Sequence, residues 1–425
     1  MVSLRTRALV LTIVGAATAL AAAELRAGTG PVGPDVTVFS LSDIGNYGGS
    51  GGIHGYSIGT RSCNRGDAPL NWCDESPGCG QGTTDEDHPV IAQNLYRLRD
   101  GRFQQIGMSW LKHGFLSTNS TTAGCSGAQG QSCTGPPLGS SQLGVGCTDP
   151  YGSGLNGSRP LGLRSEVNPT TGDYPFPYTE VSGTGPYEQR VKVAETDLDA
   201  AQNPGAFYWI EGQYIAPDDA VAENGLNNAS YRRVTVGVGP SYALSFAGVT
   251  IEGSPAIVAW KKQDPGVDFI SLDVPASTPR QRFHVARKTT DLGGGNWHYE
   301  YAIHNLNANV SARAFSVDLP GAAITNVGFT DIEHHSGEPY ATTDWVPSVS
   351  AGTVGWSTDT FLVDPDANAL RWATMFNFWF DANVPPSWAF IHQLALFKDP
   401  LTTIEFQVPV SIFADGFESG GTSNW

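Results

Sequence analysis

Short runs of β-branched and aromatic residues recur along this chain, and Gly, Pro, Asn or Asp residues separate them at intervals of about ten residues. Runs of this length match strands that alternate between two faces better than helices. Residues 206–215 and 297–304 are examples. With 51 Gly and 28 Pro among 425 residues, and no long amphipathic stretch, the sequence predicts an all-β fold.

The length of the chain indicates more than one domain, because one small sandwich does not need so many residues. The turn at residues 264–266 is the clearest break. We therefore expect two antiparallel β-sandwich-like domains, a disulfide-bonded one over residues 35–262 and a second over residues 263–410. In the second domain strands are expected at residues 283–288, 297–304, 314–319, 325–329, 353–357 and 370–380.

Two turns are predicted in the first domain. The Gly-rich run at residues 45–52 lies between two strand-like segments and is interpreted as a turn. Asp100 and Gly101 lie in the middle of the block 88–115, and an Asp-Gly pair is a strong signal for a tight hairpin. The strands on either side of this pair are therefore expected to run antiparallel.

The ends of the chain resemble those of an exported protein. Arg5 and Arg7 precede the uncharged apolar residues 8–23, a pattern typical of a signal peptide over residues 1–23. The apolar run is shorter than the ~20 residues that a membrane span needs, so no span is expected. Residues 24–34 are interpreted as a linker and residues 411–425 as a tail. We expect a secreted protein, extracellular or at the cell surface.

Charge excludes one class of partner. The chain has 24 Lys and Arg against 41 Asp and Glu, a formal net charge of −17. Without residues 1–23, which hold two of the arginines, the charge is 22 minus 41, or −19. Nucleic-acid binding depends on Lys and Arg that neutralise phosphates, so nucleic acid is not expected as a partner.

The cysteines are confined to the first domain and even in number. In an oxidising compartment they predict up to three disulfides, whose pairing the sequence leaves open. A thiolate metal site is disfavoured because no CxxC pattern occurs. The six are Cys63, Cys73, Cys79, Cys125, Cys133 and Cys147.

Several longer motifs resemble one family. HPVIAQNLYR to KHGF at residues 88–115, GCTDPYGSGLNG at 146–157, HHSGEPY at 334–340 and RWATMFNFWFDA at 371–382 resemble a family of exported bacterial β-sandwich proteins. The DGFESG segment in the C-terminal tail is similar to the endings of many exported bacterial proteins. The resemblance implies export and a β fold, and brings no activity with it.

Candidate catalytic residues gather around the predicted hairpin. His88 and His113 lie at nearly equal distances from the Asp100-Gly101 turn, so antiparallel strands would bring them together. Converging imidazoles suit a metal site or general acid–base catalysis. Tyr96 and Tyr151 are candidate catalytic phenols. The alternative is that each histidine only hydrogen-bonds backbone at a loop mouth.

Candidate substrate-binding residues lie in the same block and in the loop that follows it. The basic patch of Arg97, Arg99, Arg102 and Lys112 reverses the local charge and suits an anionic sugar, although a solvated hairpin face would look the same. Loops on a rigid scaffold often carry binding groups. The candidates are Arg97, Arg102, Asp149, Trp110 and Arg164.

A second group of acidic residues suits sugar hydrolysis. Glu333, Glu338 and Asp344 lie beside Tyr340 and Trp345, and paired carboxylates with aromatic rings are what a glycosidase needs. A solvated acidic loop is the alternative.

A divalent metal is the one cofactor that the sequence suggests. Copper would use the His88 and His113 imidazoles. Calcium would use acidic residues 85–87 or the pair Asp218 and Asp219, although neither group matches an EF-hand. Neither an HExxH nor a P-loop pattern occurs.

These observations favour an extracellular enzyme that acts on a polysaccharide, as a lyase, a hydrolase or a histidine–metal oxidase. Export, aromatic content and disulfide-held loops are the features on which this expectation rests, and they are associations with a class of proteins. The alternative is a non-catalytic surface, adhesion or carbohydrate-binding protein, which would have no converging ionisable groups.

Overall fold

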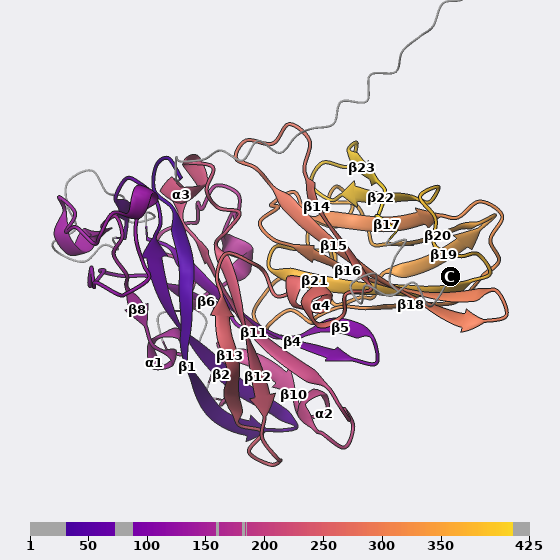
Figure 1. Cartoon of the computed structure of the whole chain (residues 1–425), viewed down its shortest axis with the longest axis horizontal. Coiled ribbons are helices and arrows are strands. Elements are labelled where there is room, and N and C mark those ends of the chain that lie inside the picture. The colour runs from indigo at the N-terminus through magenta and orange to yellow at the C-terminus, as the bar shows by residue number, and fades with distance from the viewer. Residues whose placement is uncertain (1–30, 73–87, 159–160, 181–182, 184, 411–425) are drawn as a thin grey trace, which may run out of the picture.

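The computed structural model describes residues 31–410 except 73–87, 159–160, 181–182 and 184. Strands account for 44% and helices for 8% of the structure, so the predicted all-β class is confirmed. The longest helix in these ranges is α4 (Val258–Gln263), with six residues. Within the same ranges, no helix has the length and apolar character to span a membrane. The N-terminal and C-terminal halves lie side by side (Figure 1).

The N-terminal half is built on one eleven-stranded antiparallel sheet. Its main strands, in spatial order, are β1 (Val36–Ser50), β2 (Ile53–Asn64), β10 (Val191–Ala194), β5 (Arg102–Met108), β4 (Val90–Arg99), β11 (Phe207–Ile215), β12 (Ala229–Val236) and β13 (Leu244–Ile251). Three short strands extend it, β6 (Leu111–His113), β8 (Pro150–Tyr151) and β9 (Leu161–Gly162).

This sheet curls until its first strand meets its last two. The Leu41 N–H donates to Thr250 Oγ1, and the Leu41 carbonyl accepts from Arg232. The curl encloses a core that includes Val38, Ile58 and Ile210. The Gly-rich run is part of the curling strand: β1 continues to Ser50 and only residues 51–52 form the turn, so the predicted turn over residues 45–52 is wrong in its extent.

The C-terminal half is a sandwich of two five-stranded antiparallel sheets. One sheet has the order β14 (Val267–Asp273), β15 (Arg282–Gly293), β16 (Asn296–Asn305), β21 (Thr374–Ala382) and β18 (Ile324–Thr330). The other has β19 (Val346–Ser350), β20 (Thr353–Ser357), β17 (Ala312–Asp318), β22 (Ile391–Leu396) and β23 (Thr403–Phe406). A strand is present at each predicted position of this half, with β20 matching to the residue, whereas β21 begins at Thr374 and not at the predicted residue 370.

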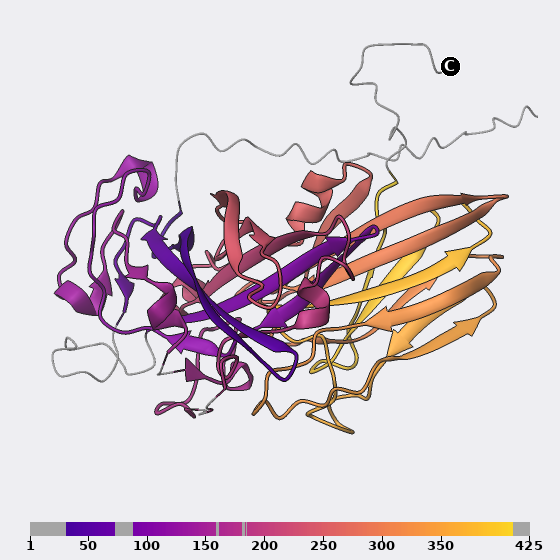
Figure 2. The same ribbon diagram turned by 90° about the horizontal axis from the view of Figure 1, so that it is seen from below.

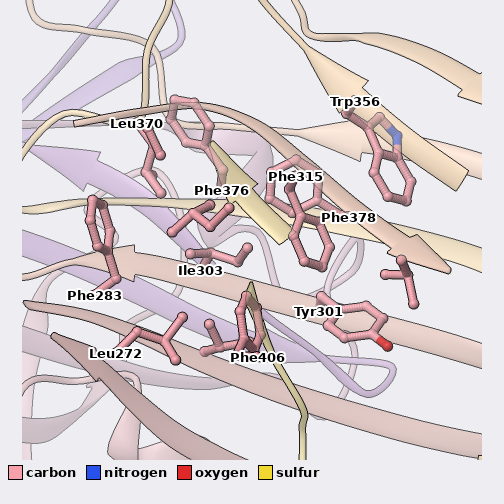
Figure 3. Close-up of a cluster of buried hydrophobic side chains, with 14 of the residues drawn as sticks. Leu272, Phe283, Tyr301, Ile303, Phe315, Trp356, Leu370, Phe376, Phe378 and Phe406 are labelled. Carbon is pink, nitrogen blue, oxygen red and sulfur yellow. The ribbon is translucent and has the colours of Figure 1, made fainter. Parts of the chain in front are cut away.

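Apolar side chains at alternate positions of the strands fill the space between these sheets. Phe376, Phe378 and Phe380 lie at every second position of β21 and are fully buried. Phe315 and Trp356 face them from the other sheet, with stacked rings 5.9 Å apart (Figure 3). Two facing sheets that alternate in this way bury one apolar face each, which is why the sequence pattern identified the strands.

The hairpin β4–β5 joins the two halves. Arg99 pairs with Arg102 across a two-residue turn, and Asp100 and Gly101 have φ of 49° and 82°, as the Asp-Gly pair predicted. The hairpin extends from the N-terminal sheet beneath the C-terminal half (Figure 1). Its Phe103 belongs to a core that both halves share and that includes Trp260 and Met375.

Hydrogen bonds cross the same contact, here called the seam. The Gln105 side chain donates to the Ala373 carbonyl and accepts from the Met375 N–H. In return, the Asn377 side chain donates to the Phe103 carbonyl, 2.9 Å away. Side-chain amides thus pair the edge of one half with β21 of the other.

Disulfides Cys63–Cys125 and Cys133–Cys147 hold the loop-rich part of the N-terminal half. Figure 2 shows these loops at the end of the molecule far from the C-terminal sandwich. Cys73 and Cys79 lie outside the described residues. The predicted disulfide-bonded N-terminal half is therefore confirmed for four of the six cysteines.

Candidate functional site

The structure brings His88 and His113 together. Strand β6 pairs with β4 so that His113 lies opposite Val90, two residues from His88. The Nε2 atom of His88 and the Nδ1 atom of His113 are 3.1 Å apart.

The histidine pair is enclosed. Each ring is 1% exposed. The Tyr178 ring stacks on His113 at 3.5 Å, and the Tyr174 hydroxyl donates to the His88 carbonyl. Burial, with the nearby His88, lowers the pKa of His113 well below its usual value, so His113 is neutral at pH 7. The pair has the environment of a packed core rather than of an open site.

Metal ligation finds limited support in the described ranges, where no three His, Cys, Asp or Glu side chains converge as a metal site requires. Of the acidic groups considered for calcium, residues 85–87 lie outside these ranges. Asp219 is fully buried, where it accepts hydrogen bonds from the Val36 N–H and the Asn228 side chain.

Tyr96 and Tyr151 lie in buried hydrogen-bond networks. The Tyr96 hydroxyl donates to Glu211 Oε1 at 2.9 Å, and burial together with the Glu211 charge raises the pKa of Tyr96 well above its usual value. The Tyr151 hydroxyl donates to the carbonyl of Phe115 and accepts from its N–H. Tyr96 lies six residues along β4 from Val90, about 20 Å at 3.3 Å per residue.

Arg164, Trp110 and Asp149 are also buried, with 3%, 1% and 1% exposure. The Arg164 guanidinium donates to the carbonyls of Ser109 and Ala373, and so connects the two halves. Trp110 packs on His335 at 4.9 Å, and burial raises the pKa of Asp149 to about 6. The structure thus packs all three side chains within the protein and gives Arg164 and Asp149 hydrogen-bonding partners there.

An open site lies along the hairpin at the seam. Three cavities of about 280, 300 and 310 Å³, in this order along the hairpin, adjoin there, and we call them together the seam groove. Gln104 lines both the first cavity and the middle one, and Arg99 and Asp100 line both the middle one and the last. The groove therefore follows the hairpin as an extended track.

The first cavity holds a pair of carboxylates. Asp331, Glu333 and His335 line it from the segment that follows β18, and Lys192 lines it from β10. Burial raises the pKa of Asp331 to about 6, against a lowering hydrogen bond from the Asn368 side chain. Asp331 is half-buried and Glu333 is exposed, so the two carboxyl groups have different environments.

The middle cavity is lined by three arginines. Arg97 forms an ion pair with Asp197 at 2.7 Å, and Arg102 forms one with Glu300 at 2.8 Å. The Arg102 guanidinium also lies over the Trp379 ring, 3.6 Å from its centre.

His298 completes the middle cavity from the C-terminal half. Its Nδ1 is 2.6 Å from Asp381 and its Nε2 is 3.5 Å from Glu300. These two carboxylates raise the pKa of His298, so the ring holds its proton more tightly than a free histidine.

The groove combines predicted and unpredicted residues. Arg97, Arg102 and Glu333 were candidates from the sequence, whereas Asp331 and His298 were not. Asp331 lies two residues before Glu333, at the end of a predicted strand, and this spacing was the available signal. Among the other acidic-loop candidates, Glu338 is enclosed and accepts from the Arg164 and Ser165 N–H groups, Trp345 is in the core, and Asp344 is exposed.

One short motif has the spacing of a serine hydrolase without its geometry. Residues 55–59 read GYSIG, but they lie inside β2 rather than on a strand-to-helix turn. The Ser57 hydroxyl is buried and donates to the Ser153 carbonyl at 2.7 Å. Ser57 is therefore a structural residue.

Comparison with known proteins adds no assignment. Neither a protein-family model nor a curated protein matches the chain. The resemblance to exported bacterial proteins remains an expectation. The residues that line the seam groove are the basis on which function is argued.

Proposed function

We propose that this chain is a secreted extracellular protein that binds a polysaccharide in the seam groove and hydrolyses it with Asp331 and Glu333. The observation that carries the proposal is the carboxyl pair in the first cavity, where one member has a pKa raised to about 6. Two carboxyl groups held in different environments are the usual requirement for glycosidic hydrolysis.

In this mechanism Asp331 is the acid. It gives its proton to the glycosidic oxygen as the bond from that oxygen to the anomeric carbon breaks. Glu333 takes a proton from a water molecule, whose oxygen forms the new bond to the anomeric carbon. The products are a reducing end and a free hydroxyl, and the transfer of one proton to Asp331 from solvent and of one from Glu333 to solvent restores the pair.

Direct attack by water predicts inversion at the anomeric carbon. In the mechanism above, the water reaches the anomeric carbon from the face opposite the leaving oxygen, and no covalent intermediate with the protein forms. We therefore expect the first product to carry the opposite anomeric configuration, as seen by proton NMR during the reaction.

The shape of the groove supports a polymer as the substrate. Three adjoining cavities, each near 300 Å³, extend along the hairpin instead of closing into one pocket. A track of this kind accommodates several consecutive sugar rings, and its open form suits cleavage inside a chain.

The test is release of reducing ends from a panel of polysaccharides. We expect activity that falls as the pH rises through about 6, because Asp331 then loses the proton that it must donate. Asp331→Asn and Glu333→Gln are each expected to lower kcat at least 100-fold, the scale of general acid–base catalysis. Glu405→Gln on β23 removes an exposed carboxylate of the same half and is the matched control.

The outcome also separates the proposal from its alternative. Binding of a polysaccharide with no new reducing ends, unchanged in Asp331→Asn and Glu333→Gln, would contradict hydrolysis. It would favour the non-catalytic carbohydrate-binding or adhesion protein instead. Both variants should unfold at the wild-type temperature, which shows that any loss of activity is not a loss of fold.

A further inference from the structure

We infer that the middle cavity of the seam groove binds the carboxylate of a uronic acid, and that the polymer in the groove is an acidic polysaccharide. This inference rests on the proposed function only for the presence of a polysaccharide. The residues that carry it differ from the carboxyl pair in the first cavity, so the two ideas can fail separately.

The hairpin places its polar residues on a single face. Arg97 and Arg99 are two apart on β4, and their partners in register on β5 are Gln104 and Arg102. Because side chains of paired residues point to the same side of a sheet, all four line the middle cavity. Such a wall presents several N–H donors, and a planar carboxylate accepts the paired donors of a guanidinium.

The local charge contrasts with that of the whole chain. The lining of the middle cavity holds three arginines and His298 against the carboxylates of Asp100 and Glu300, while Asp197 and Asp381 pair with Arg97 and His298. Four basic groups thus stand against four carboxylates, whereas the protein as a whole has a net charge of −17. An anionic polymer therefore meets less repulsion at the middle cavity than this net charge implies.

Two of the arginines are held in place before any ligand arrives. Arg97 donates to Asp197 and to the Asn203 side chain, and Arg102 makes two hydrogen bonds to the Glu300 carboxylate. Groups fixed in this way lose little conformational freedom when a ligand binds.

Arg99 is the arginine that can change partner. Its side chain is 38% exposed, and its ion partner Asp100 is 75% exposed at the hairpin turn. An exposed ion pair of neighbouring residues is weak and readily exchanged. A substrate carboxylate can therefore replace Asp100 on the Arg99 guanidinium without leaving a buried charge unpaired.

The test compares acidic polymers with their neutral esters. Polygalacturonate, alginate and hyaluronate are each measured beside their methyl esters, by equilibrium binding to the Asp331→Asn protein so that turnover does not interfere. We expect at least one free acid to bind about tenfold more tightly than its ester, and added salt to remove the difference. Binding of every ester as tightly as its acid would overturn the inference.

Substitution of Arg99 tests whether its guanidinium is the group that recognises the carboxylate. Arg99→Gln is expected to abolish the preference for the acid over its ester, and Arg99→Lys to restore part of that preference. Arg280→Gln is the matched control, because Arg280 is also an exposed arginine paired with a carboxylate, that of Glu223. A preference that survives Arg99→Gln would place acid recognition elsewhere and contradict the assignment.

Hydrolysis by the carboxyl pair and recognition of the acid by Arg99 can be contradicted separately. If the wild-type protein prefers the acid but releases no reducing ends, and Arg99→Gln loses this preference, hydrolysis is contradicted and acid recognition is supported. Release of reducing ends equally from acids and esters would keep hydrolysis and overturn acid recognition.

Discussion

Trp379 lies against β18 because its partner in register, Gly328, has no side chain. A Cβ at position 328 would be 2.1 Å from two carbons of the ring. The same ring contacts the Arg102 guanidinium in the seam groove. One glycine thus determines where an arginine of the groove can rest.

Gly328→Ala is therefore expected to move the Trp379 ring and to lower the free energy of unfolding by about 1 to 3 kcal/mol, the usual cost of overpacking. The measurement is urea unfolding together with the near-UV circular dichroism of tryptophan. Gly248→Ala on β13 is the control, because a Cβ there meets only Arg233 Cβ at an ordinary 3.8 Å. Equal stability of the two variants would contradict the packing described.

His113 provides a second prediction at the residue scale. His113→Ala removes a stacked ring from the core and the hydrogen bond to His88, so we expect a loss of about 2 to 4 kcal/mol in unfolding free energy. Hydrolysis measured well below the unfolding temperature should be retained. Loss of activity at unchanged stability would instead support the catalytic role that the sequence suggested for His88 and His113.

Single residues show where sequence reasoning reaches its limit. The hairpin turn could be predicted because Asp100 and Gly101 satisfy a local demand for positive φ. The burial of Arg164 could not, because its partners Asn94 and Ala373 lie 70 and 209 residues away. The groove could not be predicted for the same reason, since its paired residues Arg102 and Glu300 are 198 residues apart in the sequence.

At the scale of elements, the two described disulfides close loops of unequal length. Cys63 and Cys125 are 62 residues apart, whereas Cys133 and Cys147 are 14 apart. A cross-link restricts the unfolded chain more when its loop is longer, and the chain-entropy relation gives a difference of about 1.3 kcal/mol.

Replacing both cysteines of a pair with alanine tests this directly. We expect the Cys63 and Cys125 double variant to lose about 1 kcal/mol more unfolding free energy than the Cys133 and Cys147 double variant. Denaturant titration of the two double variants under oxidising conditions is the measurement. A larger loss for the shorter loop would show that native packing, not loop closure, dominates at these positions.

Strands could be identified from the sequence wherever apolar and polar residues alternate because only one face of the strand is buried. In β21 three alternate residues are phenylalanines that face the sandwich core, and this pattern is visible in the local sequence. The extent of β1 could not be predicted, because Gly45 and its neighbours look like a turn. They form a strand since Asn46 pairs with Tyr56 and its side chain accepts from the Leu244 N–H across the curled sheet.

For the whole molecule, buried histidines determine how stability responds to acid. Six of the nine histidines have pKa values lowered mainly by burial, so they are neutral in the folded protein and take up protons on unfolding below pH 6.5. The six are His113, His284, His304, His334, His335 and His392. Their contribution to stability begins to fall near pH 6.5, the usual pKa of an unfolded histidine, and continues to fall down to the lowered pKa of each folded residue.

Several ionisable groups with raised pKa values change the stability in the opposite direction as the pH falls. Burial raises the pKa of Asp35, Asp149 and Asp331 to about 6, and a carboxyl with a raised pKa favours the folded state as the pH falls below that value. His298, whose pKa is raised, opposes the six histidines already at higher pH. Asp219 and Glu338, whose pKa values are also raised by burial, act in the same direction as the three carboxyls. The balance predicts a stability that falls progressively from about pH 7 down to pH 5, because the six histidines outnumber the groups that oppose them.

Denaturant unfolding across the pH range measures this balance. We expect the free energy of unfolding to fall by about 2 to 4 kcal/mol between pH 7.5 and pH 5. His392→Phe, which replaces the buried imidazole of β22 with an apolar ring, should reduce the slope over the same range. A stability that stays constant down to pH 5 would contradict the neutral state of these histidines.

The amide contacts at the seam have a consequence for inheritance. Gln105 and Asn377 each complete the backbone hydrogen bonding of the opposite half, and Phe103 and Trp260 share one core with Ala302 and Met375. A recombination event that moved either half into another gene would leave these backbone groups and rings without partners. Selection should therefore transmit the two halves of this chain together, as one gene segment and not as two exchangeable modules.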